Sequence, residues 1–183
     1  GWRYTATPAL SFFAGNQADD AACVVLQIYA GSSATGSPVQ TIAVPRVAGA
    51  WSTNATTLAD GTYTAQATQT DAAGNTGTST ANTFTIVPTV VSVAPPTIAR
   101  GASHETLTVT GTNFAAGASA SVTGAGVAVN STQFDSSTQL TLDVSIDGHA
   151  ALGARNVTVT NTAGGSGTLT GGLTVVAAAL DAA

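Results

Sequence analysis

Short runs in which apolar and polar residues alternate constrain most strongly what this chain can fold into. The clearest run is residues 139–147, where every second side chain from Leu140 to Ile146 is apolar and the others are polar. A period of two residues is typical of a strand that buries one face and exposes the other. Shorter runs of the same kind hold Leu107/Val109, Val157/Val159 and Leu173/Val175 in the second half, and Val24/Leu26/Ile28, Ile42/Val44, Tyr63/Ala65/Ala67 and Phe84/Ile86 in the first.

Turn signals separate these runs at intervals of ten or so residues, among them Gly31-Ser32, Asp60-Gly61 and Gly74-Asn75. Thr fills about one position in six, and its branched side chain favours pleated surfaces. The Ala-rich pieces meet a Gly before they reach the roughly 12 residues that a stable helix needs. The sequence therefore predicts an all-β chain of short antiparallel strands arranged as sandwiches.

The prolines of residues 87–96 indicate a domain boundary. Pro88, Pro95 and Pro96 disfavour a helix and stiffen the chain, so we expect a short extended linker with the boundary near Pro88. Residues 68–87 and 158–176 have almost equal lengths, and both are predicted as strand, Gly-rich turn and strand. This internal echo favours two tandem sandwiches, residues 1–87 and 88–183, over one barrel.

Charge and cysteine content exclude several classes of function. The net charge is −5, and the only cations are Arg3, Arg46, Arg100 and Arg155, so the chain has no basic patch for nucleic acid. No apolar run approaches the roughly 18 residues of a membrane helix, so we expect no membrane insertion. Cys23 is the only cysteine, which excludes an intrachain disulfide, and we expect a buried, unreactive thiol. Since position 1 is Gly rather than Met, we also expect a processed or excised segment.

The aromatic residues have a structural and a binding interpretation. Tyr63 follows Asp60 and Gly61 in a pattern that predicts a tyrosine corner, in which the phenol bonds backbone upstream of its own strand. The alternative is that Tyr63, or the rings of Trp51 and Trp2, stack on sugar. Packing is the favoured role for Trp51.

Oxygen-bearing residues of the first half form a candidate calcium site. Asp60, Asp71 and Asn75 could bring carboxylate and amide oxygens into neighbouring loops at one end of the first sandwich. The simpler interpretation is that Asp71 and Asn75 supply turn chemistry, since Asx side chains bond their own backbone. We favour the turn, so calcium is the one cofactor considered.

Catalytic residues are poorly represented. His104 and His149 lie in predicted turns, and a hydrolytic triad needs a serine and a carboxylate in register with one of them. Glu105 is the only Glu, so a glycosidase pair would need an Asp from elsewhere. No Gly-rich loop opens a helix, which disfavours nucleotide binding. The chain is not expected to be an enzyme.

Several segments carry a family resemblance. Residues 58–65, with Asp60-Gly61-Thr62-Tyr63, residues 70–76 and the closing run around Phe84 resemble a bacterial immunoglobulin-like (Ig-like) domain over most of residues 8–87. Residues 107–114, which end in Asn113-Phe114, and residues 153–159 resemble an IPT/TIG-type Ig-like domain over nearly all of the second half. The resemblance implies structural roles for Tyr63, Gly61, Trp51, Phe84 and Phe114.

Such domains are repeated extracellular modules of large bacterial surface or secreted proteins, so the resemblance implies a non-enzymatic stalk, spacer, adhesive unit or filament subunit. We expect each sandwich to hold its two ends on opposite sides. The implied partners are neighbouring Ig-like domains or copies of the chain, paired through an unprotected edge strand at residues 168–176. A host or cell-surface protein is a further partner. The alternatives are a glycan-binding module that uses Trp51 and Tyr29, and a phage virion decoration or tail module.

Overall fold

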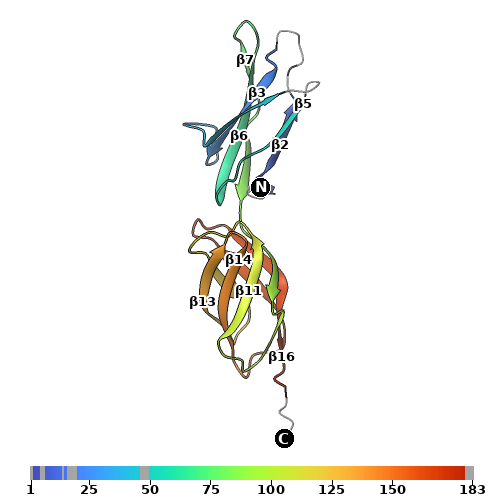
Figure 1. Ribbon diagram of the computed structural model, residues 1–183, viewed down its shortest axis with the longest axis vertical. Helices are drawn as coiled ribbons and strands as arrows, with labels where there is room; N and C mark the ends of the chain where they lie inside the picture. Colours follow the sequence, from blue (N-terminus) through green and yellow to red (C-terminus); the bar gives the residue numbers. More distant parts are fainter. Residues whose placement is uncertain (1, 5–6, 14, 16–19, 46–49, 180–183) are drawn as a thin grey trace. The chain divides into compact units, whose positions relative to one another are not determined.

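The computed structural model describes residues 2–4, 7–13, 15, 20–45 and 50–179 of the 183-residue chain. Every regular element in these ranges is a β-strand, so the all-β prediction is confirmed. None of the described residues belongs to a helix that is long and apolar enough to cross a bilayer. The chain divides into two compact units, Gly1–Ile86 (unit 1) and Val87–Ala183 (unit 2), shown in Figure 1.

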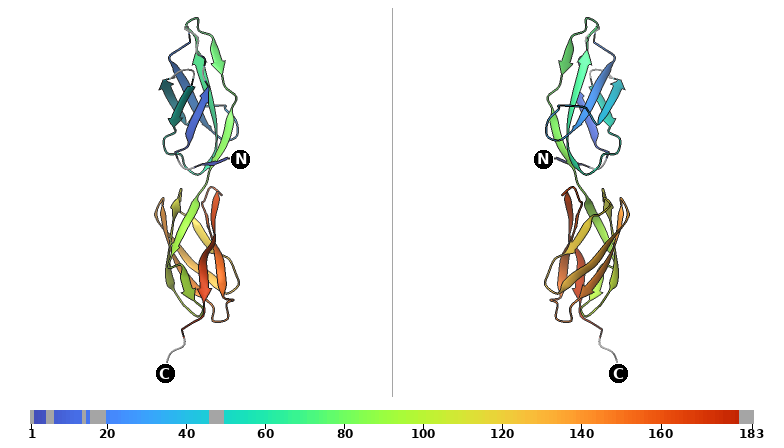
Figure 2. Two further views of the ribbon diagram at one scale, coloured as in Figure 1. Left: turned by 90° about the vertical axis from the view of Figure 1, so that its right-hand side faces the viewer. Right: turned by 90° about the vertical axis from the view of Figure 1, so that its left-hand side faces the viewer.

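Unit 1 has one large and one small sheet. The large sheet has the order β1-β8-β6-β3-β4, with β7 paired to β6, and β2 and β5 form a separate two-stranded sheet (Figures 1 and 2). β1 runs parallel to β8, with Trp2 opposite Phe84 and Tyr4 opposite Ile86. The strands are β1 (Trp2–Tyr4), β2 (Ala9–Phe13), β3 (Cys23–Ala30), β4 (Gln40–Pro45), β5 (Ala50–Asn54), β6 (Gly61–Thr70), β7 (Thr76–Thr78) and β8 (Asn82–Ile86).

The core of unit 1 lies between these two sheets. Its fully buried members include Leu26 and Ile28 of β3, Ala65 of β6 and Phe84 of β8, and Trp51 of β5 closes it from the small sheet. Alternation along β3 places Cys23 outside, because Val24, Leu26 and Ile28 face inward. The expectation of a buried thiol is therefore wrong: Cys23 is exposed.

Unit 2 is a sandwich of two four-stranded sheets, in the orders β10-β16-β15-β12 and β13-β14-β11-β9. Strand β14, predicted from the alternation of residues 139–147, is buried at every second residue. The strands are β9 (Thr89–Ala94), β10 (Thr97–Ala99), β11 (Glu105–Thr112), β12 (Ser119–Val122), β13 (Val127–Ser136), β14 (Gln139–Ile146), β15 (Gly153–Thr160) and β16 (Ser166–Val176).

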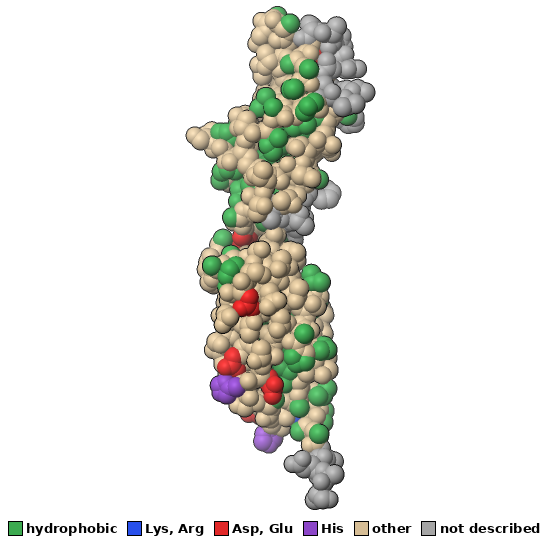
Figure 3. All heavy atoms as spheres, in the orientation of Figure 1, with side chains coloured by type: hydrophobic (Ala, Val, Ile, Leu, Met, Phe, Trp, Pro, Cys, Tyr) green, Lys and Arg blue, Asp and Glu red, His purple; other side chains and the backbone are tan. Residues whose placement is uncertain are grey.

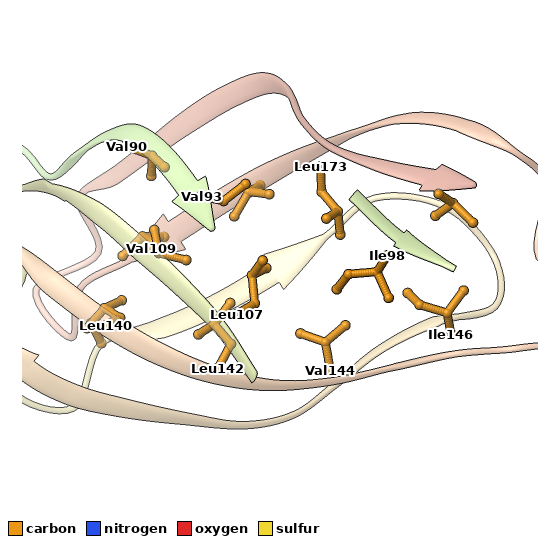
Figure 4. Packing of buried hydrophobic residues seen from close by; sticks show 14 of the residues in the cluster. Val90, Val93, Ile98, Leu107, Val109, Leu140, Leu142, Val144, Ile146 and Leu173 are labelled. Atoms are coloured by element: carbon orange, nitrogen blue, oxygen red, sulfur yellow. The ribbon is translucent and has the colours of Figure 1, made fainter. Parts of the chain in front are cut away.

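Aliphatic side chains fill the core of unit 2. Figure 4 shows Leu107 and Val109 of β11 beside Leu140, Leu142 and Val144 of β14, which are all fully buried. Leu173 of the other sheet, with Val157 and Val159 of β15, completes the layer from its side. Each strand contributes every second residue, as expected for two sheets that face each other.

The proline-rich segment is part of unit 2 rather than a free linker. Residues Thr89–Ala94 form β9, which pairs with β11 from Thr89 opposite Thr112 to Ala94 opposite Thr108. Val87 also belongs to unit 2, where Asn113 Nδ2 donates to its carbonyl at 2.9 Å. The extended conformation was predicted, but the pairing of this segment with β11 was not. The pairing is possible because Pro95 and Pro96 follow β9, so neither proline removes an N–H donor from the strand.

Residues 168–176 are only in part the unprotected edge that we expected. β16 pairs with β15 on one side, and its last residues pair in parallel with β10, Thr97 opposite Thr174 and Ala99 opposite Val176. Near its start, a Cβ at Gly167 would collide with the Pro88 carbonyl, so the beginning of unit 2 covers that part of the strand.

Candidate functional site

The connection into β6 is built around Tyr63. Its Oη donates to the Ala59 carbonyl at 3.1 Å, and its ring stacks on Phe84 with centroids 5.9 Å apart and planes inclined by 27°. Gly61 has a φ of +152° and lies against the Tyr63 ring. Burial, and then the charge of Asp60, raise the pKa of Tyr63. The ring and hydroxyl therefore hold residues 59–63 in a corner, and Phe84 occupies one face of the half-buried ring.

The other aromatic candidates whose side chains are described are buried. Trp51 is 4 % exposed and Tyr29 is 8 % exposed, and the Tyr29 hydroxyl donates to Gln27 Oε1 at 3.0 Å. Phe114 is buried in the core of unit 2, while the Trp2 side chain lies outside the described residues. A sugar platform needs an exposed ring face, so neither Trp51 nor Tyr29 supplies one.

The candidate calcium residues lie at opposite ends of a strand. Asp60 precedes β6 and Asp71 follows it, and ten residues of extended chain separate them by about 30 Å. The expectation that both acids share one end of the sandwich is therefore wrong, because the run between them is a single uninterrupted strand. No group of three or more His, Cys, Asp or Glu side chains within the described ranges is arranged to hold a metal.

Asp71 and Asn75 form a turn together. Asp71 Oδ1 accepts from the Asn75 backbone N–H at 2.8 Å, and Asp71 Oδ2 accepts from Asn75 Nδ2 at 2.7 Å. These bonds, the side-chain bond first, lower the pKa of Asp71. Gly74, with a φ of +89°, supplies the left-handed backbone of the turn. This geometry uses both carboxylate oxygens for the hairpin between β6 and β7.

A pocket of about 440 Å³ lies beside this hairpin. Trp51, Val24 and Ala67 give it an apolar floor, and Gln69 and Asp71 are among the polar residues at its rim. Gln69 holds one wall together, because its Oε1 accepts from the Gly15 N–H at 2.8 Å and its Nε2 donates to the Ala21 carbonyl at 2.9 Å. The pocket can admit a small polar molecule.

A polar network in unit 2 was not found from the sequence. His104 Nδ1 lies 2.9 Å from Asp143 Oδ2, and Asn130 Nδ2 donates to Asp143 Oδ1 at 2.9 Å and to Ser145 Oγ at 2.8 Å. Hydrogen bonding to the carboxylate, and then its charge, raise the pKa of His104. The same bond, with that from Asn130, lowers the pKa of Asp143.

The network joins His104 to the polar face of β14 through both its backbone and its ring. Ser145 Oγ accepts from the His104 backbone N–H at 3.1 Å, while the ring nitrogen Nδ1 is directed at the carboxylate. Nucleophilic catalysis requires the base nitrogen within reach of the hydroxyl. The sequence signal was the polar face of residues 139–147, but only the fold brings Asn130 and His104 onto that face. Figure 3 shows acidic and histidine side chains on this side of unit 2, with hardly any Lys or Arg visible.

Comparison with known proteins matches both units to families. The family described as "Bacterial Ig-like domain" matches residues 3–86. The family described as "Quinohemoprotein amine dehydrogenase, alpha subunit domain III" matches residues 87–182, which is more than half of the chain. The tandem of two Ig-like domains is thereby supported. No curated protein matches the chain.

Several solved structures match the chain at low sequence identity. They include the Clostridium thermocellum CbhA fibronectin(III)-like modules (15 % identity, TM-score 0.32, 97 % of this chain and 89 % of that one). The titin I-band fragment I67-I69 matches with 15 % identity and a TM-score of 0.34, over 96 % of this chain and 62 % of that one. Bacteroides ovatus SGBP-B, in complex with a mixed-linkage heptasaccharide, matches with 16 % identity and a TM-score of 0.34. This match covers 96 % of this chain and 42 % of that one. The chain thus spans less than two thirds of the last two proteins.

Proposed function

We propose a function from one premise: the chain belongs, through residues 87–182, to the family described as quinohemoprotein amine dehydrogenase, alpha subunit domain III. That description names one domain of one subunit and gives no residue of this chain a chemical role. The function we propose is a non-enzymatic structural or adhesive segment of a bacterial surface or secreted protein, in which unit 2 is a load-bearing spacer.

The haem implied by the family description does not fit this chain. Attachment of a c-type haem needs two cysteines and a histidine as C-x-x-C-H, whereas Cys23 is the only cysteine. His104 is exposed and is bonded to Asp143, so its surroundings do not form the apolar pocket that a haem requires. The relationship is therefore one of domain architecture.

The observation that supports the spacer role is the course of the chain through unit 2. The chain enters at Pro88, which lies against Gly167 near the start of β16, and it leaves after Val176 at the end of that strand. Nine residues of strand separate these two points, about 30 Å at about 3.3 Å per residue. The entrance and exit of unit 2 therefore lie at opposite ends, as we expected of a spacer.

This geometry determines how unit 2 would carry tension. β9 and β16 both run along the line from entrance to exit, and each pairs with neighbours through hydrogen bonds perpendicular to that line. Tension between Val87 and Val176 therefore loads these ladders in shear, so that many bonds must break together. The Asn113 bond to the Val87 carbonyl and the 2.7 Å contact of the Thr89 and Thr112 hydroxyls fasten the entrance.

Single-molecule force spectroscopy of the full chain tests the proposal. Paired cysteines at positions 87 and 176, in a Cys23→Ser background, would load unit 2 in shear. The matched control attaches the handles at Val127 and Ile146, which face each other at one end of the β13–β14 ladder, so that the same unit unzips one pair at a time. We expect a clearly higher unfolding force for the 87–176 pair. Equal forces along both directions would overturn the load-bearing role.

The finer family assignment also belongs to this proposal. We assign unit 2 to the IPT/TIG type on the motif of residues 107–114, which forms β11 and ends at Asn113 with a φ of +59°. The proposal includes an extracellular or cell-surface location, which the match of unit 1 to the bacterial Ig-like family supports. The glycan-binding alternative draws no support from Trp51 or Tyr29, because both rings are buried.

A further inference from the structure

Arg155 is a partly buried cation without an anionic partner. Among the described residues, no carboxylate lies within 4 Å of its guanidinium, since the recorded ion pairs are His104–Asp143 and His149–Asp147. Desolvating a positive charge is costly unless an opposite charge or several hydrogen bonds compensate it. The side chain lies on β15 of unit 2, where its neighbours explain only part of its hydrogen bonding.

The guanidinium is held in place by backbone. Its two terminal nitrogens donate to the carbonyls of Ala151 and Ala154, the latter at 3.3 Å. Nε is buried and has no hydrogen-bond partner. It lies under Gly124, where a Cβ would be 2.7 Å from Nε and where φ is +106°. The turn at Gly124 thus covers Nε. Each terminal nitrogen has two N–H groups and donates to one carbonyl, so each keeps a second N–H donor.

Arg155 lines a pocket of about 520 Å³, together with the turn at residues 124–126 and residues 147 and 149–151 of the neighbouring loop. Arginine presents parallel N–H donors whose spacing matches the two oxygens of a carboxylate. We propose that this pocket binds a carboxylate, and that in the assembled protein the carboxylate is an Asp or Glu side chain of a partner protein docked on unit 2.

The lining of the pocket favours this occupant over other anions. The residues around Arg155 include Gly124, Ala125, Ala150 and Ala151, and no aromatic ring is among those that line the pocket, so an acidic sugar would lack a stacking surface. Asp147 also lines the pocket. Its negative charge opposes a phosphate dianion more strongly than a carboxylate, which carries a single charge.

The proposal is independent of the spacer role, because a spacer with an empty pocket would still carry load. It adds to that role an attachment point on the side of the strands that bear tension. The two proposals also fail separately: Arg155→Gln should abolish carboxylate binding and leave the shear force of unit 2 unchanged, because residue 155 pairs with Leu173 of β16 through its backbone and not through its side chain.

NMR titration of the ¹⁵N-labelled full chain tests the pocket. The probe is glutamate blocked at both ends, as N-acetyl-glutamate N-methylamide, and the matched control is the blocked glutamine, which has the same shape without the charge. We expect saturable shifts of the amides at residues 124–126 and 150–151 with the glutamate probe alone. Galacturonate and inorganic phosphate, titrated separately, should bind more weakly than blocked glutamate.

Three variants make the result specific. Arg155→Gln should remove the shifts, whereas Arg100→Gln, which removes the same charge from an exposed site of unit 2, should retain them. Asp147→Asn keeps the oxygen that accepts from the His149 N–H and removes the repulsion, so the affinity should rise roughly twofold to fivefold. A gain in affinity cannot arise from unfolding.

Contrary outcomes are as definite. Equal binding of blocked glutamine, or binding that survives Arg155→Gln, would show that the charge of Arg155 does not select the ligand. Tighter binding of galacturonate or phosphate would overturn the assignment to an acidic side chain. Absence of shifts with every probe, together with no gain from Asp147→Asn, would reduce Arg155 to a brace for the loop at residues 147–154.

Discussion

The two units divide their strands differently between the two layers that cover each core. Unit 2 encloses its core between two four-stranded sheets, whereas the layer that faces the large sheet of unit 1, within the described ranges, is the two-stranded pair β2 and β5. Sixteen described residues form the buried cluster of unit 2 and twelve form that of unit 1. Each unit has eight described strands, but the second layer of unit 1 has only two of them, so this layer is thinner than either sheet of unit 2.

Large side chains help to fill the core of unit 1, where the second layer has only two strands. The indole of Trp51 and the ring of Phe84 occupy the core of unit 1, whereas the buried cluster described for unit 2 is aliphatic apart from Phe114. Amide side chains also join the layers: Gln40 donates to the Thr56 carbonyl and accepts from its N–H, both at 3.0 Å. The comparison indicates that a thin layer depends on a few large residues, and a complete one on many small ones.

The chain also passes through the two units differently. In unit 2 it enters and leaves at opposite ends. In unit 1, β1 lies parallel to β8, so that Trp2 faces Phe84 two residues before the last residue of that unit, Ile86. The expectation of opposite ends is thus met in unit 2 and not by the described residues of unit 1, because a parallel pair places the first strand beside the last.

The largest effect should follow from removal of the central ring of unit 1. Trp51→Ala leaves a cavity in the thin layer and should cost about 3–5 kcal/mol, a large part of the stability of a small domain. We expect calorimetry to show loss of the unit 1 transition and an unchanged unit 2 transition. The matched change Leu142→Ala should lower the midpoint of unit 2 without abolishing its transition. Equal losses in both units would contradict the comparison.

A smaller effect should follow from Asn161→Ala in unit 2. Asn161 is 3 % exposed, accepts from the Ala115 N–H at 3.1 Å and donates to the Asn113 carbonyl at 2.7 Å. Its loss leaves two buried backbone groups without partners, which costs about 1–3 kcal/mol. Chemical denaturation should show this loss in unit 2 alone, while Asn54→Ala on the exposed end of β5 serves as the neutral control. No change with Asn161→Ala would show that water replaces the amide.

The sequence predicted the strands well because their signal is local. Alternation over residues 139–147 depends only on which side chains face the core, and β14 is buried at every second position as expected. The same holds for Tyr63, whose short-range bond to the Ala59 carbonyl spans four residues. Features set within a few residues of one another can be inferred from order along the chain.

The sequence failed where pairing across the chain decides the outcome. The edge assigned to residues 168–176 is covered at residues 174–176 by β10, a three-residue strand with no alternation long enough to detect. Asp60 and Asp71 were placed together because both border turns, but ten residues of strand separate them. The pairing of His104 with Asp143 spans 39 residues and likewise left no local mark.

A modest effect should follow from Tyr63→Phe, which sharpens the comparison within unit 1. The phenylalanine ring keeps the stack on Phe84 and loses only the hydrogen bond to the Ala59 carbonyl, worth about 0.5–1.5 kcal/mol. Denaturation monitored by circular dichroism should show this decrease for unit 1. Tyr29→Phe, which loses a bond to the Gln27 side chain on its own strand, should cost less. A larger loss from Tyr29→Phe would show that the corner is not a fixed point of the fold.

The smallest effect distinguishes the two units by pH. Both histidines lie in unit 2, so the pair formed by His104 and Asp143 has no counterpart in unit 1. Because the pKa of His104 is raised above its ordinary value of 6.5, the contribution of His104 to the stability of unit 2 is complete below pH 6.5. This contribution is lost as the pH rises through the raised pKa. Because the pKa of Asp143 is lowered below its ordinary value of 3.8, the contribution of Asp143 to the stability of unit 2 is present above pH 3.8. This contribution is lost as the pH falls through the lowered pKa.

The pair should therefore favour folded unit 2 most strongly between these two pH values, by a small amount because both side chains are exposed. NMR titration of the imidazole signals should give a higher pKa for His104 than for the same ring in Asp143→Asn. His149→Gln is the matched control, since it removes the other imidazole and leaves the pair intact. Equal pKa values of His104 in the two chains would mean that the 2.9 Å contact does not persist in solution, and that the difference between the units lies in their cores alone.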